Sequence, residues 1–398
     1  MKKNIAILIH KMYDTGVAKT ASKISSYLPD EKYNKYIICN DTSEKAFTFE
    51  GEIFDLHMVE SKNIFKKLFN FLKRIFLISK IKKEKQIDVS ISFQQNVSFG
   101  NIFTKKNNKV IVSVRTFLLK EAKNPLYRFF YKKIIKYMYN KADLIISVSE
   151  AIKADLIENF GIRREKVEVV YNFYDIEKID DLAREAINSN HISLFDHPVF
   201  ITAGRLKKQK GHWHLIRAFK KVKEEITDAK LVILGKGDLE EYFKNLAREL
   251  QIEEDVHFLG FESNPFKYFL RSDIYVFPSL YEGFPNALNE AMVCGLPVIS
   301  SDCESGPREI LSPNMSIEKA STKKIIYSDY GVLIPVCDGN YYSGNDELSY
   351  EEILLAKSMI DLYNDRSMLK KYSELSKERV NSFNVQNIIT EWEKYIDE

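Results

Sequence analysis

Long apolar runs are missing from this chain of 398 residues. Hydrophobic residues make up 45% of it, but no stretch approaches the ~20 consecutive apolar residues that a membrane-spanning helix needs. The first residues, MKKNIAILIHKMYDTG, are only superficially similar to a signal peptide. Their apolar run ends at Ile9, and His10 and Lys11 interrupt it. We therefore expect a cytoplasmic protein whose first residues form a buried strand.

Cysteine is also scarce, with Cys39, Cys294, Cys303 and Cys337 as the four examples. None belongs to a CxxC pair, and none is spaced with histidines as zinc ligands are. This usage fits reduced thiols in the cytosol and predicts no metal site.

Neither half of the chain has balanced charge, although the net charge of the whole is only +3. Residues 1–175 hold 32 basic and 19 acidic residues, a net of +13, which leaves −10 for the remainder. A basic half indicates an anionic partner, such as nucleic acid, a lipid surface or a phosphorylated substrate.

Short apolar runs alternate with helical patterns in two series, separated by a polar stretch at 172–197. Continuous apolar strands between helices predict parallel sheets covered on both faces. Two such series predict an α/β fold of two doubly wound domains. The first series of expected strands is 4–10, 35–40, 88–93, 109–115, 144–149 and 167–171. The second is 199–204, 230–234, 256–259, 274–277, 298–301 and 332–335, followed by helical patterns at 350–363 and 368–396.

The segment YEGFPNALNEA, at 281–291, follows an expected strand. Pro285 suits a first helical turn and Asn286 can cap it, so a helix is expected to begin here. The free N–H groups of such a helix start bind phosphate readily. Glu282 and Glu290 can point to one place and accept hydrogen bonds from sugar hydroxyls. The alternative is one solvated loop acid and one exposed helix acid.

The segment GRLKKQKG, at 204–211, also follows an expected strand. Arg205 and Lys210 lie where a diphosphate would arrive, and cations there would neutralise the charge of a departing nucleotide. Glycines on both sides permit close approach of the backbone. The alternative is an ordinary solvated lysine-rich loop. Gly235, in LGKGD, and Gly16, at the first helix, are weaker signals of the same kind.

Together these segments resemble the family-4 retaining glycosyltransferases, which have the GT-B fold. The resemblance rests on the E-x7-E pair within EGFPNALNEAM, followed by CGLPVIS, and on GRLKKQKG, LVILGKGDLE, SGPREIL, YGVLIP, VSEAIKADL and VVYNFYD in the right order. It covers nearly the whole chain and is strongest from about 198 to 336. It implies two Rossmann-like domains facing across a cleft. The acceptor-side domain would span 1–175, with a helix at 380–398 packed back on it, and the nucleotide-sugar domain would span 190–379.

The resemblance also implies roles for particular residues. Arg205 and Lys210 would hold the donor diphosphate and stabilise the leaving nucleotide. Glu282 would hydrogen-bond the transferred sugar, and Glu290 would bind the ribose hydroxyls. No metal or other cofactor would be needed, because basic side chains and a helix end replace it. The remaining donor-binding positions are Gly204, Gly235, Gly283, Phe284, Pro285, Asn286, Ala287 and Leu288.

The first domain departs from the family pattern in two places. Gly16, which would approach the donor when the domains close, follows a threonine where the family often has a second glycine. Arg115 follows Ser113-Val114 where many members have a histidine. Arg115 either binds an acceptor carboxylate or phosphate, or only braces the cleft. Asp14 is the other acceptor-side candidate.

The activity that the resemblance implies is retaining transfer of a hexose or N-acetylhexosamine from a UDP-sugar. The acceptor would be a glycan or a lipid-linked molecule in cell-envelope polysaccharide synthesis. A GDP-mannose-dependent mannosyltransferase, and an epimerase or phosphorylase on the same scaffold, are the alternatives. A nucleic-acid binder is disfavoured, because no stacking-aromatic motif or helix-turn-helix is evident.

Residues 62–85 predict a basic amphipathic helix that lies on an anionic membrane surface. Tyr127–Lys136 is a second aromatic and basic stretch that can extend this surface. The alternative is a helix that packs on its own domain and shows its lysines to solvent. The apolar face holds Phe65, Leu68, Phe69, Leu72, Ile75 and Phe76, and the cations Lys66, Lys67, Lys73 and Arg74 lie away from it.

Overall fold

The computed structural model describes residues 1–398 except 13–15, 44–46, 59–62, 119–124 and 317–320. The chain forms two compact units. The N-terminal unit comprises Met1–Asn172 together with Val385–Glu398, and the C-terminal unit comprises Phe173–Asn384. The chain thus passes between units at 172 and 384, where the sequence predicts boundaries at 175, 190 and 380.

A seven-stranded sheet forms the centre of the N-terminal unit among the described residues, in the order β3-β2-β1-β4-β5-β6-β7. Its neighbouring strands pair in parallel. Apolar side chains of the inner strands are buried, as expected of a sheet covered on both faces. The strands are β1 (Lys3–Lys11), β2 (Tyr33–Asp41), β3 (Glu52–Asp55), β4 (Val89–Ser92), β5 (Lys109–Val114), β6 (Leu144–Ser147) and β7 (Val167–Val169).

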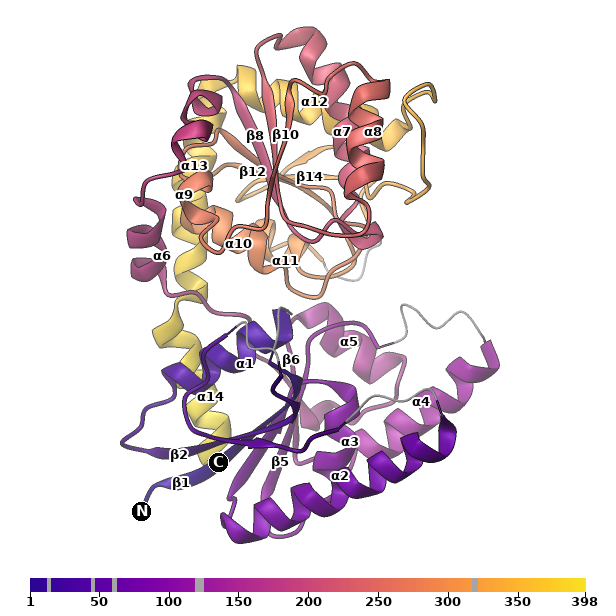
Figure 1. The fold of residues 1–398 in the computed structure, drawn as a ribbon, viewed down its shortest axis with the longest axis vertical. Coiled ribbons are helices and arrows are strands. Elements are labelled where there is room, and N and C mark those ends of the chain that lie inside the picture. Colours follow the sequence, from indigo (N-terminus) through magenta and orange to yellow (C-terminus); the bar gives the residue numbers. More distant parts are fainter. Residues whose placement is uncertain (13–15, 44–46, 59–62, 119–124, 317–320) are drawn as a thin grey trace. The chain divides into compact units, whose positions relative to one another are not determined.

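Helices cover both faces of this sheet. On one face α1 contacts the C-terminal helix α14, and on the other α3 packs against both α2 and α4 (Figure 1). The helices are α1 (Gly16–Tyr27), α2 (Ile64–Glu84), α3 (Gln95–Phe103), α4 (Pro125–Tyr139), α5 (Glu150–Glu158) and α14 (Val385–Asp397).

The C-terminal unit has a second seven-stranded sheet among its described residues, in the order β10-β9-β8-β11-β12-β14-β13. Its pairs are parallel except for the edge pair β13 and β14. The strands are β8 (Val199–Ala203), β9 (Lys230–Leu234), β10 (Val256–Gly260), β11 (Ile274–Phe277), β12 (Val298–Ser301), β13 (Ile326–Tyr327) and β14 (Val332–Ile334). The helices are α6 (Ile176–Ala183), α7 (His212–Glu225), α8 (Glu240–Glu249), α9 (Phe266–Phe269), α10 (Asn286–Val293), α11 (Pro307–Leu311), α12 (Tyr350–Asn364) and α13 (Arg366–Val380).

Three expectations about elements are wrong. The stretch 172–197, expected only as a polar separation between the two series, contains the helix α6, which packs on α9 and α10. The pattern at 368–396 is not one helix, because a 3-10 turn at Asn381–Phe383 separates α13 from α14 and buries Phe383. The short edge strand β3 was not expected, since EIFD is half-exposed and lacks a buried apolar run.

The terminal helix α14 packs on the N-terminal unit. This is where the resemblance places the helix at 380–398. Its Trp392 is buried and lies 6.1 Å from Phe93, measured between ring centroids. At its end Asp397 accepts a hydrogen bond from Tyr33 at 3.0 Å and pairs with Lys3 at 3.0 Å.

No helix within the described ranges is both long enough and apolar enough to cross a membrane. The four cysteines are buried and form no disulfide bond.

Candidate functional site

The basic turn, residues 204–211, joins β8 to α7 in the C-terminal unit. Its last residue, Gly211, has φ +63°, and a Cβ there would lie 2.3 Å from the carbonyl oxygen of Pro278. Only glycine fits this close approach. The turn is also hydrogen-bonded to the loop after β11, because Leu280 N–H donates to Gln209 O (2.8 Å) and the Gln209 side chain donates to Tyr281 O (2.8 Å). The basic turn is therefore held at the carboxyl ends of β8 and β11, which are adjacent strands.

Lys210 and Glu282 form an ion pair at this edge of the sheet. The ammonium lies 2.7 Å from Glu282 Oε1, and the side chains are 18% and 9% exposed. Lys210 also lies over the ring of Phe277, 5.1 Å from its centroid. The cation predicted to hold a diphosphate and the acid predicted to bind a sugar hydroxyl are thus brought together and neutralise each other.

The turn after β9 touches the basic turn through its backbone. Gly235 has φ +136°, and a Cβ there would lie 1.9 Å from the carbonyl oxygen of Gly204. Gly204 N–H in turn donates to Leu234 O at 2.9 Å. Arg205 is exposed in this arrangement, whereas its neighbour Leu206 is fully buried. Gly235 therefore lets the two turns meet where no side chain would fit.

The helix α10 begins at the predicted place, but its cap differs from the prediction. Pro285 occupies the N-cap with an extended backbone and no side-chain hydrogen bond, and Asn286 is the first helical residue. Asn286 does not cap the helix, because its Oδ1 accepts a hydrogen bond from Tyr174 Oη at 2.9 Å. The unsatisfied N–H groups of the first turn remain suited to an anion.

The loop before α10 is fixed by the segment after β12. Ser305 Oγ donates to Gly283 O at 2.5 Å. Gly306, with φ +88°, packs so closely that a Cβ there would lie 2.5 Å from Pro285 Cδ. The ring of Phe284 lies edge-on to that of Phe383 at 5.2 Å. These contacts therefore fix the position of the loop before α10.

The second acid, Glu290, is buried on α10. Both Glu290 and Glu282 lie close enough to Tyr275 to act on its phenol electrostatically. Burial raises the pKa of Tyr275, and these two negative charges add to the effect. The predicted acid pair is thus gathered around β11. Ala287 is half-buried, whereas the side chain of Leu288 is fully buried in the core, so only the backbone of Leu288 can meet a ligand.

Comparison with known proteins gives the family of this chain. The model described as Glycosyltransferase Family 4 matches residues 15–178, and the model described as Glycosyl transferases group 1 matches residues 184–324. An uncharacterized glycosyltransferase of Methanocaldococcus jannaschii is 37% identical over 351 residues, which cover 85% of this chain and 86% of that protein. The chain belongs to the family-4 glycosyltransferases.

Two further likenesses extend over essentially the whole glycosyltransferase. One is to the N-acetylgalactosamine-N,N'-diacetylbacillosaminyl-diphospho-undecaprenol 4-alpha-N-acetylgalactosaminyltransferase of Campylobacter jejuni, at 30% identity over 98% of this chain and 99% of that protein. The other is to the solved structure of Anabaena HepE in complex with UDP, with a TM-score of 0.75 at 17% identity and complete coverage of both chains. The second likeness concerns the fold, which is GT-B.

In the N-terminal unit, Arg115 is hydrogen-bonded to neighbouring side chains of the same unit. It is buried at the end of β5 and donates hydrogen bonds to Asn172 Oδ1 and, at 3.4 Å, to Ser113 Oγ. Thr20 of α1 donates to the same amide oxygen at 3.3 Å. This geometry favours the bracing alternative for Arg115. Gly16 begins α1 and is exposed, and Asp14 lies outside the described residues.

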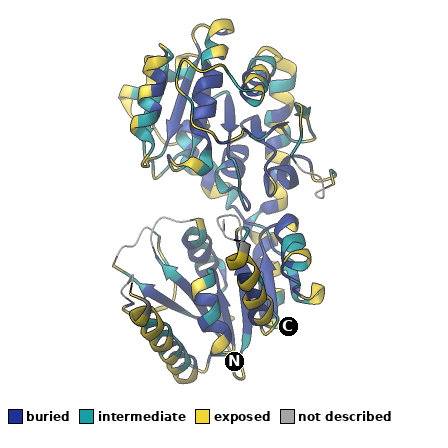
Figure 2. Ribbon diagram, turned by 90° about the vertical axis from the view of Figure 1, so that its right-hand side faces the viewer, coloured by how far each residue is buried: buried dark blue, intermediate teal, exposed yellow. Residues whose placement is uncertain are grey.

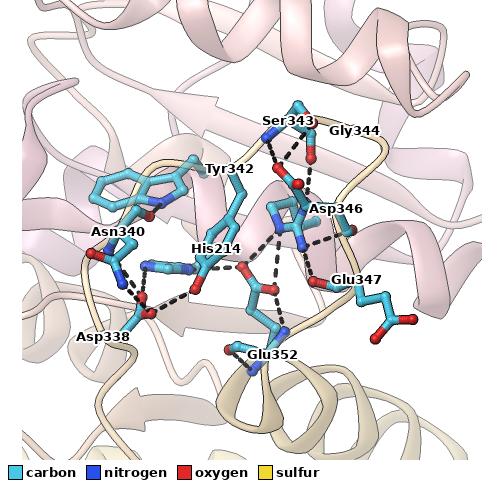
Figure 3. Close-up of polar contacts among 12 residues, drawn as sticks. His214, Asp338, Asn340, Tyr342, Ser343, Gly344, Asp346, Glu347 and Glu352 are labelled. Atoms are coloured by element: carbon cyan, nitrogen blue, oxygen red, sulfur yellow. Dashed lines mark hydrogen bonds and ion pairs between the residues drawn. The ribbon is translucent and has the colours of Figure 1, made fainter.

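Sequence reasoning missed a buried polar network that anchors α7, the helix that follows the basic turn. His214 Nδ1 lies 2.8 Å from Glu352 Oε1, and Arg217 Nε donates to the same oxygen at 3.0 Å (Figure 3). All three side chains are fully buried. The other carboxylate oxygen of Glu352 accepts from Ser349 N–H at 2.9 Å and completes a capping box on α12. The signal was a pair of polar residues, His214 and Arg217, spaced i, i+3 in the otherwise apolar WHLIRAF.

The same network holds the segment 338–347 against α7 (Figure 3). The guanidinium of Arg217 donates to the carbonyl oxygens of Ser343, Asp346 and Glu347. Nearer the site, Lys208 of the basic turn lies over the ring of Tyr341, 5.0 Å from its centroid. The network therefore fixes both α7 and the segment that borders the turn.

Proposed function

We propose that this glycosyltransferase moves a hexose or N-acetylhexosamine from a UDP-sugar to a lipid-linked or glycan acceptor in cell-envelope polysaccharide synthesis, with retention of anomeric configuration. The observation that carries the proposal is the Lys210–Glu282 pair beside the two glycine turns and the first turn of α10. The Campylobacter relative, whose name gives a diphospho-undecaprenol-linked acceptor, supports the acceptor class. The UDP bound in HepE supports the nucleotide.

The proposed donor complex exchanges the ion pair for two contacts with the substrate. The diphosphate takes the ammonium of Lys210, and Glu282 is released to accept a hydrogen bond from a hydroxyl of the sugar. Arg205 and the N–H groups at the start of α10 face the same phosphates. Glu290 accepts hydrogen bonds from the ribose hydroxyls.

The proposed reaction breaks the bond between the anomeric carbon and the phosphate oxygen and forms one to the acceptor oxygen. Negative charge grows on the departing nucleoside diphosphate as that bond breaks. Fixed cations and helix N–H groups stabilise this charge more in the transition state than in the bound donor. We propose that they take the place of a metal ion.

A thermal-shift series with UDP-, GDP- and ADP-sugars tests the donor. A ligand that binds only the folded protein raises the unfolding temperature, and at equal concentration a tighter ligand raises it more. We expect the largest shift with a UDP-hexose or UDP-N-acetylhexosamine, and an equal or larger shift with GDP-mannose would contradict the choice of nucleotide. Product formed from the donor without an acceptor would indicate an epimerase instead. NMR of the product anomer tests retention.

We further propose that the acceptor is reached at an anionic membrane surface, to which residues 62–85 contribute. The basic character of 1–175 supports this part of the proposal. Salt-sensitive binding to DNA, without any binding of nucleotide sugars, would contradict it in favour of a nucleic-acid function.

A further inference from the structure

The apolar face of α2 points to solvent rather than into the N-terminal unit. Phe65 is 80% exposed, and the helix instead packs through Ile78 and Ile81. The helix therefore packs on its own domain, as the alternative expects, but it exposes its apolar stripe to solvent as well as its lysines. Arg74 is also not on the free side, since Nη1 donates to Asn96 O at 2.9 Å. The exposed apolar residues are Phe65, Leu68, Phe69, Leu72 and Phe76, spaced as one stripe.

The helix α4 has apolar side chains on two opposite sides. Its inner side is buried through Tyr131, Ile135, Met138 and Tyr139. A helix at the surface of a soluble protein normally has polar residues on its other side, and large exposed apolar patches mark interaction sites. The outer side here instead carries Leu126, Phe129, Phe130, Ile134 and Tyr137, all exposed.

The helices α2 and α4 belong to one layer, because α3 packs against both of them (Figure 1). The last residue of α3, Phe103, is itself half-exposed and lies edge-on to Phe71 of α2 at 5.7 Å. Figure 2 views this side of the layer and shows long exposed stretches on its helices. The two stripes and Phe103 therefore lie on helices of one layer, and we call these exposed apolar residues together the docking surface.

Lysines surround the C-terminal half of α4. A shallow hollow of about 410 Å³ is lined by Lys133, Lys136, Tyr137, Asn140 and Lys141, and none of these described lining residues is acidic. The Lys141 ammonium donates to Tyr137 Oη at 2.7 Å and lies over its ring, and Lys133 lies over Phe129. Two of the three lysines are thus held over exposed aromatic rings, the combination that anionic bilayer interfaces attract.

We propose that the docking surface inserts its apolar side chains into the interface of a bilayer, while the hollow on α4 binds the phosphate of an anionic phospholipid. This inference rests on the proposed use of a lipid-linked acceptor and assigns the contact to two helices rather than to residues 62–85 alone. Charge complementarity selects an anionic bilayer as the partner, because the apolar stripes are flanked by lysines.

Vesicle flotation of the full chain tests the hollow. The vesicles contain phosphatidylcholine with or without phosphatidylglycerol, at low salt. We expect binding only with phosphatidylglycerol, and a loss of about 100-fold or more in the Lys133→Glu/Lys136→Glu/Lys141→Glu variant, since each lysine near an anionic surface contributes about fivefold. A control variant makes the same charge change at exposed lysines of the C-terminal unit: Lys221→Glu/Lys370→Glu/Lys371→Glu. It should bind like wild type.

A second variant, Leu126→Ala/Phe130→Ala/Ile134→Ala, removes only exposed side chains, so the fold should survive. We expect this variant to lose the part of the binding that persists at high salt. Three results would overturn the inference. The wild type does not float with vesicles that contain phosphatidylglycerol, or the lysine variant and its control lose binding equally, or the protein binds DNA more strongly than vesicles. Thermal shifts with UDP-sugars in the same variants report on the donor site separately. The membrane proposal and the donor proposal can therefore fail independently of each other.

Discussion

Lys82 provides a quantitative test of how α2 is attached to the N-terminal unit. Its ammonium is buried and donates to two neutral acceptors, Asn101 O at 3.1 Å and Asn101 Oδ1 at 2.7 Å. Burial lowers the pKa of Lys82 from 10.5 to about 7. Holding the charged form in this place therefore destabilises the folded state.

The direction of the pH effect follows from the two pKa values. Between pH 7 and 10.5 the unfolded chain binds more protons at this lysine than the folded one, so the free energy of unfolding rises with pH. One pKa unit corresponds to about 1.4 kcal/mol, so the full effect is about 5 kcal/mol. About 2 kcal/mol of it falls between pH 7 and pH 9.

Denaturant unfolding of wild type and Lys82→Met at pH 7 and pH 9 measures this effect. Trp392 reports the N-terminal unit in a Trp213→Phe background, since the chain has two tryptophans. Loss of the contacts with Asn101 lowers the unfolding free energy of the variant by the same amount at pH 7 and at pH 9. Any change with pH in the difference between wild type and variant therefore reports the titration of Lys82. We expect the wild type to gain about 2 kcal/mol relative to the variant at pH 9. The exposed neighbour Lys83→Met should show no such change, and a difference that stays constant with pH would refute the reasoning.

Three further predictions concern the C-terminal unit. Glu282→Ala and Lys210→Ala should each reduce turnover at least about 100-fold, as measured with the best UDP-sugar donor on protein that is still folded at the assay temperature; wild-type rates in both would remove the site assignment. Glu352→Gln should cost about 3–5 kcal/mol of unfolding free energy, because it leaves the fully buried Arg217 without its counter-charge, whereas an equal loss in the control Glu351→Gln would contradict this. Burial, and then the charge of Lys210, lowers the pKa of His212 to about 3. Stability should therefore fall by about 1.4 kcal/mol per pH unit below about pH 6, with a slope that His212→Gln lacks in acid denaturation.

The positions of the glycine turns and of α10 could be predicted because their signals are local. A glycine such as Gly235, at which two backbones meet, can be recognised from a few residues of sequence. The same is true of a helix that starts after a buried strand. The parallel topology then places the turns after β8, β9 and β11 at one edge of the sheet, without knowledge of any tertiary contact. The cap of α10 was mispredicted because its geometry depends on Tyr174, which is more than a hundred residues away.

The direction in which α2 faces could not be predicted for a related reason. An amphipathic pattern fixes which residues share a side, but not which side meets the protein. The C-terminal half of α2 settles the matter here, because Lys82 and Ile78 are both buried and turn the aromatic stripe outward. The network of Arg217 and Glu352 escaped prediction because the partners lie 135 residues apart.

The ion pair between Lys210 and Glu282 also bears on the order of events in the proposed reaction. Both groups are largely buried, so removing one partner leaves the other charge poorly solvated. A nucleoside diphosphate without sugar can compensate Lys210 but leaves Glu282 unpaired. A complete nucleotide sugar compensates both, because its phosphates meet the ammonium while a sugar hydroxyl donates to the carboxylate. The free enzyme should therefore favour the intact donor over the spent nucleotide, and the re-forming ion pair would help to expel the product after transfer.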